Sequence, residues 1–144
     1  MHLLTRSHYK HCATCALSLG ILASALIPAT TCAAPLLRCQ IDQGGSTQML
    51  EFAPVSDPYP VKAIDINGRF RFKVVMVGDE RHIDYIKLYT YSHARRQPVL
   101  LHEAKYMAPV AGPAPAALTG LNYVYSPQLE RELQYQCSLQ EVAR

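Results

Sequence analysis

Apolar and polar residues alternate in short runs from residue 37 to residue 139, and this alternation restricts the fold more than any other feature of the sequence. Alternate residues of a β-strand point to opposite faces of a sheet, so each run indicates a strand with one buried face. Glycine, proline and asparagine separate the runs, and no stretch keeps helical spacing. We therefore predict an all-β domain of about seven or eight antiparallel strands, with runs at 37–41, 49–52, 62–66, 69–77, 81–91, 99–107, 121–125 and 132–139.

Three stretches between these runs have a different character. Residues 54–60 contain three prolines and are predicted to be poor in strand. Residues 108–119 are rich in proline and alanine and are predicted to form an extended loop. The one candidate for a helical turn is 126–130, where Ser126 would cap the turn and Pro127 would take its first position.

The positions of the apolar residues also predict how the central strands pair. Cross-strand partners share a face of the sheet, so where the apolar residues of both strands are at even positions, the numbers of two paired residues must have an even sum. The large apolar side chains of the two longest central runs are at even positions: Phe70, Phe72, Val74, Met76, Ile86 and Leu88. Three-residue loops at Gly78-Asp79-Glu80 and at Asn67-Gly68-Arg69 satisfy the rule, whereas two-residue turns do not. The prediction is a β-meander.

The first 33 residues have the three-part layout of a secretory signal peptide. Arg6 and Lys10 give a basic start without acidic residues, an apolar run covers 12–27, and small residues lead up to Ala33. We predict cleavage after Ala33, which leaves a single domain over 34–144. An uncleaved anchor is the alternative, but the run is shorter than the roughly 20 residues that a membrane-spanning helix needs.

Two of the five cysteines, Cys39 and Cys137, remain after this cleavage. Cys12 and Cys15 leave with the signal peptide, so their Cys-x-x-Cys spacing is not interpreted as a redox motif. Cys32 would serve a lipoprotein, but the usual preceding leucine is absent. Two cysteines near opposite ends of an exported chain are expected to pair. Both fall on inward faces, so the disulfide would join the first and last strands inside a small antiparallel β-sandwich or closed β-barrel.

Charge and hydropathy give little indication of a partner. Removal of residues 1–33, which hold two basic residues and no acidic one, lowers the formal charge from +3 to +1. A nearly neutral domain gives no reason to expect nucleic acid as a partner.

No segment after Ala34 is apolar enough to span a membrane. No phosphate loop or dinucleotide fingerprint occurs, so we expect no cofactor, and no serine nucleophile elbow occurs. The expected location is the periplasm or the exterior of the cell.

The predicted register places basic residues and tyrosines together on the outward face. In this register Arg71 is opposite Lys87, Lys73 is opposite Tyr85, and the chain near Arg69 is opposite Tyr89. Asp65 is placed to pair with Arg71. Arginine forms forked hydrogen bonds to anions and tyrosine offers stacking area, so the face could bind an anionic group. Alternatively, these residues are solvated strand positions held by cross-strand and cation–π contacts. We call this set the basic–tyrosine surface: Arg69, Arg71, Lys73, Tyr85, Lys87, Tyr89 and Tyr91.

His82 and Asp84 are the other candidates for chemistry, because they share a strand face close to Asp79 and Glu80. A metal site needs three or four ligands, and this group offers one histidine with carboxylates, so a polar strand end is the favoured interpretation. His102-Glu103 begins like a zinc-protease motif, but position 106 is a tyrosine. We therefore predict neither a metal site nor a catalytic residue.

The segment Arg38–Gly45, together with the strand after it, resembles the start of periplasmic lysozyme inhibitors of the membrane-bound type. Those inhibitors are small, disulfide-closed β-barrels, so the resemblance implies such a barrel and an inhibitory function. The loops that they insert into the enzyme cleft have no counterpart in this sequence. We expect an exported, non-catalytic β-domain that binds a partner, and an inhibitor of an envelope hydrolase is the second hypothesis. A metal-binding or enzymatic domain that uses His82 and Asp84 is the third.

Overall fold

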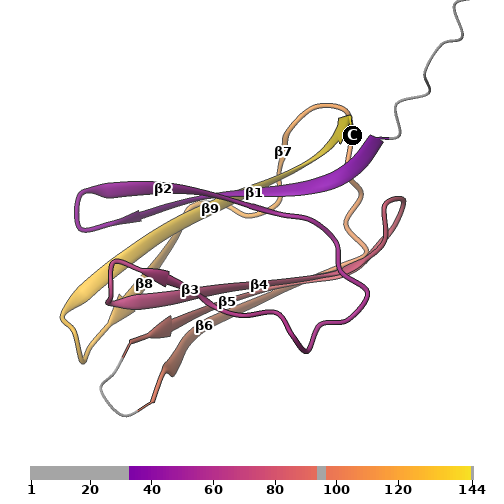
Figure 1. Cartoon of the computed structure of the whole chain (residues 1–144). Coiled ribbons are helices and arrows are strands. Elements are labelled where there is room, and N and C mark those ends of the chain that lie inside the picture. The colour runs from indigo at the N-terminus through magenta and orange to yellow at the C-terminus, as the bar shows by residue number, and fades with distance from the viewer. Residues whose placement is uncertain (1–32, 94–96, 144) are drawn as a thin grey trace, which may run out of the picture.

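The computed structural model describes residues 33–93 and 97–143, which form strands and connecting loops (Figure 1). The predicted signal peptide lies outside the described residues except for Ala33, the first residue of the first strand. In the described ranges, no helix has the length and apolar character to cross a membrane. The strands are β1 (Ala33–Gln43), β2 (Ser46–Phe52), β3 (Ile64–Ile66), β4 (Phe70–Gly78), β5 (Ile83–Ser92), β6 (Val99–Met107), β7 (Ala116–Ala117), β8 (Asn122–Ser126) and β9 (Arg131–Ala143).

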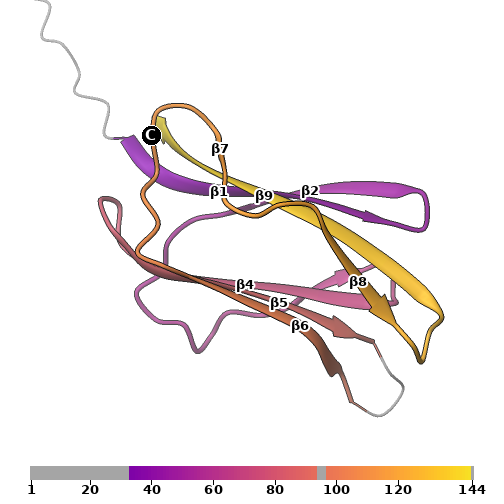
Figure 2. The same ribbon diagram turned by 180° about the vertical axis from the view of Figure 1, so that it is seen from behind.

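The strands form two antiparallel sheets that face each other, as Figures 1 and 2 show. The first sheet has the order β2-β1-β9, with β7 and β8 both pairing with β9. The second sheet has the order β3-β4-β5-β6. No strand is shared between the sheets, so the fold is a sandwich and not a closed barrel. This result confirms the all-β prediction and decides between the two architectures that the sequence left open.

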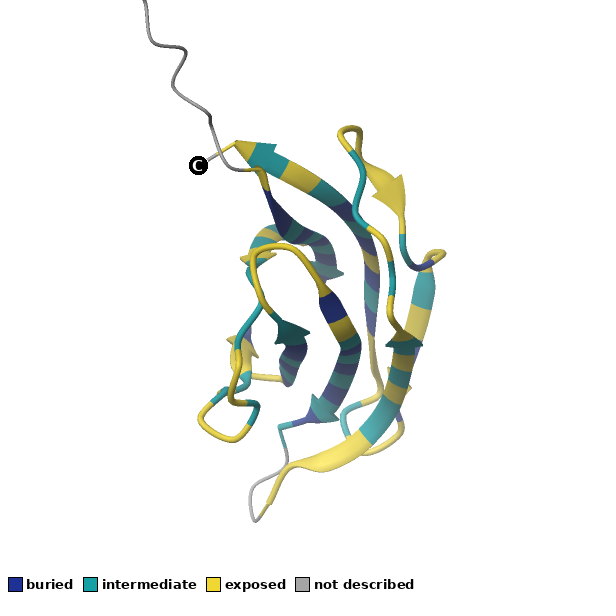
Figure 3. Cartoon of the chain, turned by 90° about the vertical axis from the view of Figure 1, so that its right-hand side faces the viewer, coloured by how far each residue is buried: buried dark blue, intermediate teal, exposed yellow. Residues whose placement is uncertain are grey.

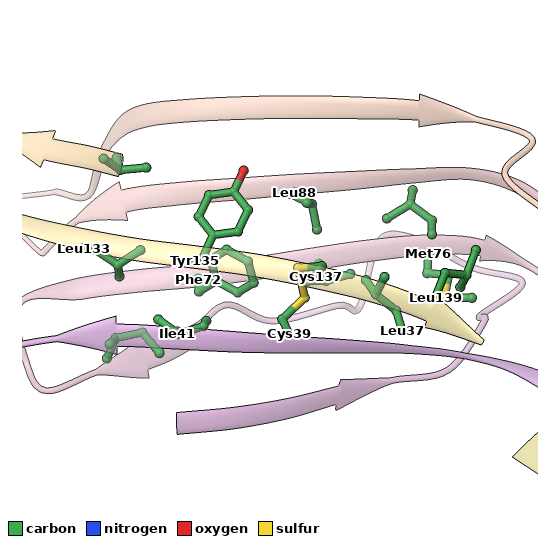
Figure 4. Close-up of a cluster of buried hydrophobic side chains, with 14 of the residues drawn as sticks. Leu37, Cys39, Ile41, Phe72, Met76, Leu88, Leu133, Tyr135, Cys137 and Leu139 are labelled. Carbon is green, nitrogen blue, oxygen red and sulfur yellow. A yellow bond between two sulfur atoms is a disulfide. The ribbon is translucent and has the colours of Figure 1, made fainter. Parts of the chain in front are cut away.

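The core lies between the sheets, where the long strands β1, β4, β5 and β9 bury alternate residues along most of their length (Figure 3). The even-numbered apolar residues of β4 and β5 point inward, as predicted. Cys39 and Cys137 are cross-strand partners of β1 and β9, and their Cα atoms are 4.1 Å apart. Their disulfide lies in the core beside Leu37 and Leu139 (Figure 4). The predicted pairing of the first and last strands is therefore confirmed.

The turn between β3 and β4 agrees with the parity argument. Ile66 pairs with Phe70, which leaves the three-residue loop Asn67-Gly68-Arg69. Asn67 and Gly68 both have positive φ, of 52° and 67°, a conformation that suits asparagine and glycine. The predicted pair of Asp65 with Arg71 is present in the same ladder.

The predicted pairing of β4 with β5 is wrong by four residues. Arg71 is opposite Tyr91, not Lys87, and Lys73 is opposite Tyr89, not Tyr85. The reason is the turn: β4 continues to Gly78, the connection spans 79–82, and a bulge at Val77/Gly78 adds one residue. A four-residue loop alone would violate the even-sum rule, but the bulge restores it. The prediction of which residues face inward and outward on β4 and β5 is therefore correct, whereas the predicted cross-strand partners are not.

Three smaller differences concern the connections. Residues 127–130 form the hairpin turn between β8 and β9, and Ser126 is the last residue of β8, so the predicted helical turn at 126–130 is wrong. The predicted loop at 108–119 contains the two-residue strand β7. The stretch 54–60 is poor in strand, as predicted, although Val55 forms an isolated parallel bridge with Val77.

Candidate functional site

The basic–tyrosine surface lies on the outer face of the second sheet. Its six residues within β4 and β5 are all partly buried, whereas Arg69, just before β4, is exposed. Val75 shares this face and is only 5% exposed. Lys87 is directly opposite Val75, and we infer that the long side chains around this valine cover it. The structure thus brings the predicted strand residues together on one face, in a packed rather than an open arrangement.

A short chain of polar contacts marks one end of this surface. Arg71 Nη2 lies 3.5 Å from His93 Nε2, and His93 Nδ1 lies 3.3 Å from Asp65 Oδ1. The second carboxylate oxygen of Asp65 accepts the backbone N–H of Gly68 at 2.8 Å. Asp65 therefore contacts the histidine and the β3–β4 turn, and the histidine lies between the carboxylate and the guanidinium.

Next to Arg71, two tyrosines stack on each other. The ring centroids of Tyr89 and Tyr91 are 6.1 Å apart, with an angle of 20° between the ring planes. Burial raises the pKa of the Tyr91 phenol above its usual value. Lys73 is the cross-strand partner of Tyr89 and has no ion-pair partner among the described residues. This part of the surface combines aromatic area with a cation that no carboxylate of residues 33–93 and 97–143 neutralises.

The far end of the surface is neutralised from the edge strand. Lys87 Nζ lies 3.1 Å from Glu103 Oε1 on β6 and 5.7 Å from the ring centroid of Tyr89. The hydrogen bond to Glu103 raises the pKa of the Lys87 ammonium group. Lys105 of β6 lies over the Tyr85 ring, 5.4 Å from its centroid. These contacts are the cross-strand and cation–π pairs of the solvated-face interpretation, so Lys87 and Tyr85 have structural partners.

Arg69 lies apart from the rest, at one end of the sandwich. It lines a hollow of about 500 Å³ together with Arg131, Gln43 and Asn67. Asn67 donates hydrogen bonds to the Gln43 carbonyl and side-chain oxygens, at 3.1 and 3.0 Å, which ties the two neighbouring turns together. No local pattern pointed to Arg131, because it is distant along the chain and reaches this hollow only through the β8–β9 hairpin.

The His82 and Asp84 pair has a structural explanation. His82 Nε2 lies 3.3 Å from Asp84 Oδ1, and both side chains are exposed. Asp79 accepts the backbone N–H groups of Arg81 and His82 at 2.7 and 2.8 Å, and these bonds lower its pKa. The Asp79 carboxylate thus stabilises the β4–β5 turn. Within the described ranges, no group of three histidine, cysteine, aspartate or glutamate side chains is placed to hold a metal ion.

Comparison of the chain with protein-family models, with curated proteins and with solved structures found no match. The segment that resembles the lysozyme inhibitors, Arg38–Gly45, forms the second half of β1 and its turn into β2. Because the fold is a sandwich, the closed barrel implied by that resemblance is wrong. The inhibitor hypothesis keeps only this short sequence likeness in its favour.

Proposed function

We propose that this protein is an exported, non-catalytic binding domain that holds an anionic group of an envelope component. The binding site would be the part of the basic–tyrosine surface formed by Arg71, Lys73, Tyr89 and Tyr91. The observation that carries the proposal is the contrast between the two lysines of the surface. Lys87 is paired with Glu103, whereas Lys73 stands opposite Tyr89, one ring of the stacked pair, and has no carboxylate partner among the residues that the structure describes.

The chemistry of these four residues suits a planar or phosphate-like anion beside an apolar group. An arginine offers forked donors, and a lysine offers a point charge. The stacked rings supply apolar area at little entropic cost, because a tyrosine has few rotatable bonds and these rings are already packed. The export proposal agrees with the disulfide, since disulfides persist in oxidising compartments.

Purified protein can be tested on two anionic probes: peptidoglycan sacculi, which carry carboxylates, and phosphatidylglycerol vesicles, which carry phosphates. Zwitterionic phosphatidylcholine vesicles serve as the neutral comparison. We expect binding to at least one anionic probe, and weakening as salt is added, because exposed charges are screened within about 8 Å at physiological ionic strength. Lys73→Glu should weaken binding by about tenfold or more, since loss of a site contact can cost about 2 kcal/mol.

Lys62→Glu is the matched control, because Lys62 is an exposed loop residue and the substitution makes the same change in net charge. It should bind like the unchanged protein, and both variants should keep their melting temperature. Absence of binding to both anionic probes would refute the proposal. Equal weakening by Lys62→Glu would show that only net charge matters and that the assigned site is wrong.

A further inference from the structure

The strand β6 forms one edge of the second sheet (Figures 1 and 2), has a register shift against β5 near its start, and approaches β8 of the first sheet at a few residues. In the described part of the chain it pairs with β5 alone. It has nine residues and no proline, and its residues Val99, Leu100 and Met107 are 37%, 47% and 65% exposed. Proteins usually shield such edges by shortening, bulging or covering them, because an open edge can pair with another chain.

The hydrogen bonds show which backbone groups of β6 are open. Ala108 N–H donates to the Asp84 carbonyl at 2.9 Å, next to the pair of Met107 with Tyr85. In an antiparallel ladder, hydrogen-bonded and non-hydrogen-bonded pairs alternate. Even-numbered residues at this end of β6 therefore bond to β5. The backbone N–H and C=O groups of Glu103 and Lys105 point away from the sheet, toward the open edge.

The side chains along this edge complement a second copy of themselves. If two β6 strands pair antiparallel about Ala104, each Glu103 lies opposite a Lys105 of the other copy. In this register, odd-numbered residues of one copy are opposite odd-numbered residues of the other. The open backbone N–H and C=O groups of the two strands can therefore bond to each other. The side chains that face outward in one copy also lie on the outward face of the other. Glu103 and Lys105 are both exposed, and both side chains lie on the outward face of the sheet. The small side chains of the two Ala104 residues would meet at the twofold axis.

Neighbouring registers are disfavoured by charge. A shift by one pairing step places Glu103 opposite Glu103 in one direction and Lys105 opposite Lys105 in the other. Like charges directly opposite each other destabilise an antiparallel pair, and opposite charges stabilise it. An odd register would mismatch both the faces and the hydrogen bonds. The register about Ala104 is thus the one that the charges of β6 select.

We propose that two copies of this protein associate through antiparallel pairing of their β6 strands. This pairing joins the second sheet of one copy to the second sheet of the other and gives one continuous sheet of eight strands. In this twofold dimer the β6 edge of each copy is paired with that of the other, so neither β6 edge is left to pair with a further chain. This dimer does not depend on the proposed function. If both hold, the dimer carries two basic–tyrosine surfaces on one continuous sheet face, so a partner with several anionic groups would be held at two points.

Two single charge reversals test the register. Glu103→Lys places lysine opposite lysine, and Lys105→Glu places glutamate opposite glutamate. Each should weaken the dimer by about tenfold or more, because two attractive cross-strand pairs become repulsive. The two variants mixed together should form a heterodimer, since the two lysines of one copy then face the two glutamates of the other. The measurement is sedimentation equilibrium of the purified protein over a wide concentration range.

The double variant Glu103→Lys/Lys105→Glu should dimerise like the unchanged protein, because it restores both opposite-charge pairs. Lys62→Glu serves as the control for net charge and should leave dimerisation unchanged, and circular dichroism checks that every variant is folded. A monomer at all concentrations would overturn the proposal. A dimer whose stability does not respond to the single reversals, or is not restored in the mixture, would show that another surface forms it.

Discussion

Several polar atoms are buried in the core without a protein partner. Among the described residues, the Tyr135 hydroxyl, Thr90 Oγ1, Ser92 Oγ and His102 Nε2 form no hydrogen bond. The Tyr135 ring packs against Phe72, with centroids 5.2 Å apart, and its hydroxyl points away from β9 (Figure 4). Burial of the phenol, with a smaller effect of Tyr106, raises the pKa of Tyr135 well above its usual value. This tyrosine therefore contributes its ring to the core, while its hydroxyl carries a desolvation cost.

Tyr135→Phe should stabilise the protein by about 1 kcal/mol at neutral pH, because an unpaired buried hydroxyl costs about 1 to 3 kcal/mol. The gain should widen at alkaline pH. Above about pH 10 the unfolded tyrosine ionises, whereas the folded one stays protonated, so the unchanged protein loses stability as pH rises. At about pH 11 this effect adds roughly 1.4 kcal/mol to the advantage of the variant. The measurement is urea unfolding at both pH values.

Tyr123→Phe is the matched control, because it removes the hydroxyl of an exposed tyrosine. Its effect should be small and the same at both pH values. A destabilisation by Tyr135→Phe at neutral pH would mean that the hydroxyl has a partner that holds it. An advantage that does not grow with pH would contradict the burial of an unionised phenol.

Among the structural elements, the β4–β5 turn decides how the basic–tyrosine surface is assembled. Gly78 has a φ of 155°, and a Cβ atom at this position would lie 2.1 Å from the His82 carbonyl oxygen. The bulge at Val77/Gly78 thus requires a residue without a side chain. The following residues are held by the carboxylate of Asp79, which accepts two backbone N–H groups. Glycine and aspartate together fix this turn.

Gly78→Ala should lower the free energy of unfolding by about 2 kcal/mol or more, because the backbone must shift to relieve the clash. Gly120→Ala is the matched control, since a Cβ atom there meets nothing within 4 Å and the φ is not in the left-handed region. Its effect should stay within about 0.5 kcal/mol. Urea unfolding compares the two variants. Similar stabilities would show that the turn adapts and that Gly78 does not set the register.

This turn also explains what could be predicted from the sequence. The inward face of β4 and β5 follows from the even positions of residues such as Phe72 and Leu88, and a bulge combined with a longer loop does not change that parity. The partners of Arg71 and Lys73 depend on the number of residues in the connection. The sequence Gly-Asp-Glu-Arg-His allows more than one loop length, and only the close approach of backbone atoms at Gly78 selects the observed one. The face was therefore predictable, whereas the contacts on it were not.

Contacts between distant segments were outside the reach of local patterns. The neutralisation of Lys87 by Glu103 requires the pairing of β5 with β6, which contains its own register shift between Thr90 and Tyr91. The hollow beside Arg69 requires the β8–β9 hairpin to bring Arg131 to it. Alternation along one strand carries no information about either arrangement. The disulfide was predictable because only two cysteines, Cys39 and Cys137, follow the predicted cleavage site at Ala33.

At the scale of the whole molecule, β1 and β9 are joined twice, by the hydrogen bonds of the first sheet and by the disulfide. Cys39 and Cys137 are separated by 98 residues, and their strands β1 and β9 pair along ten residue positions from Ala33 to Asp42. Nearly the whole domain is thus enclosed in one covalent loop. The strand pairing already specifies the position of the termini, so the bond is not needed to define the topology. Its contribution is expected mainly in the unfolded chain, whose freedom it restricts.

We therefore expect reduction to weaken the domain without changing its fold. Closure of a loop of about 100 residues contributes roughly 4 to 5 kcal/mol on the chain-entropy model, and measured contributions are typically about 2 to 4 kcal/mol. A domain of this size has a net stability of only about 5 to 10 kcal/mol, so the urea midpoint should fall markedly. The far-UV circular dichroism spectrum should stay that of a β-protein at low urea.

N-terminal sequencing of the same sample establishes which cysteines it retains. If it starts near Ala34, thiol titration of the denatured, unreduced protein should find no free thiol. Two thiols per chain, or equal midpoints for the oxidised and reduced forms, would contradict this account of the disulfide.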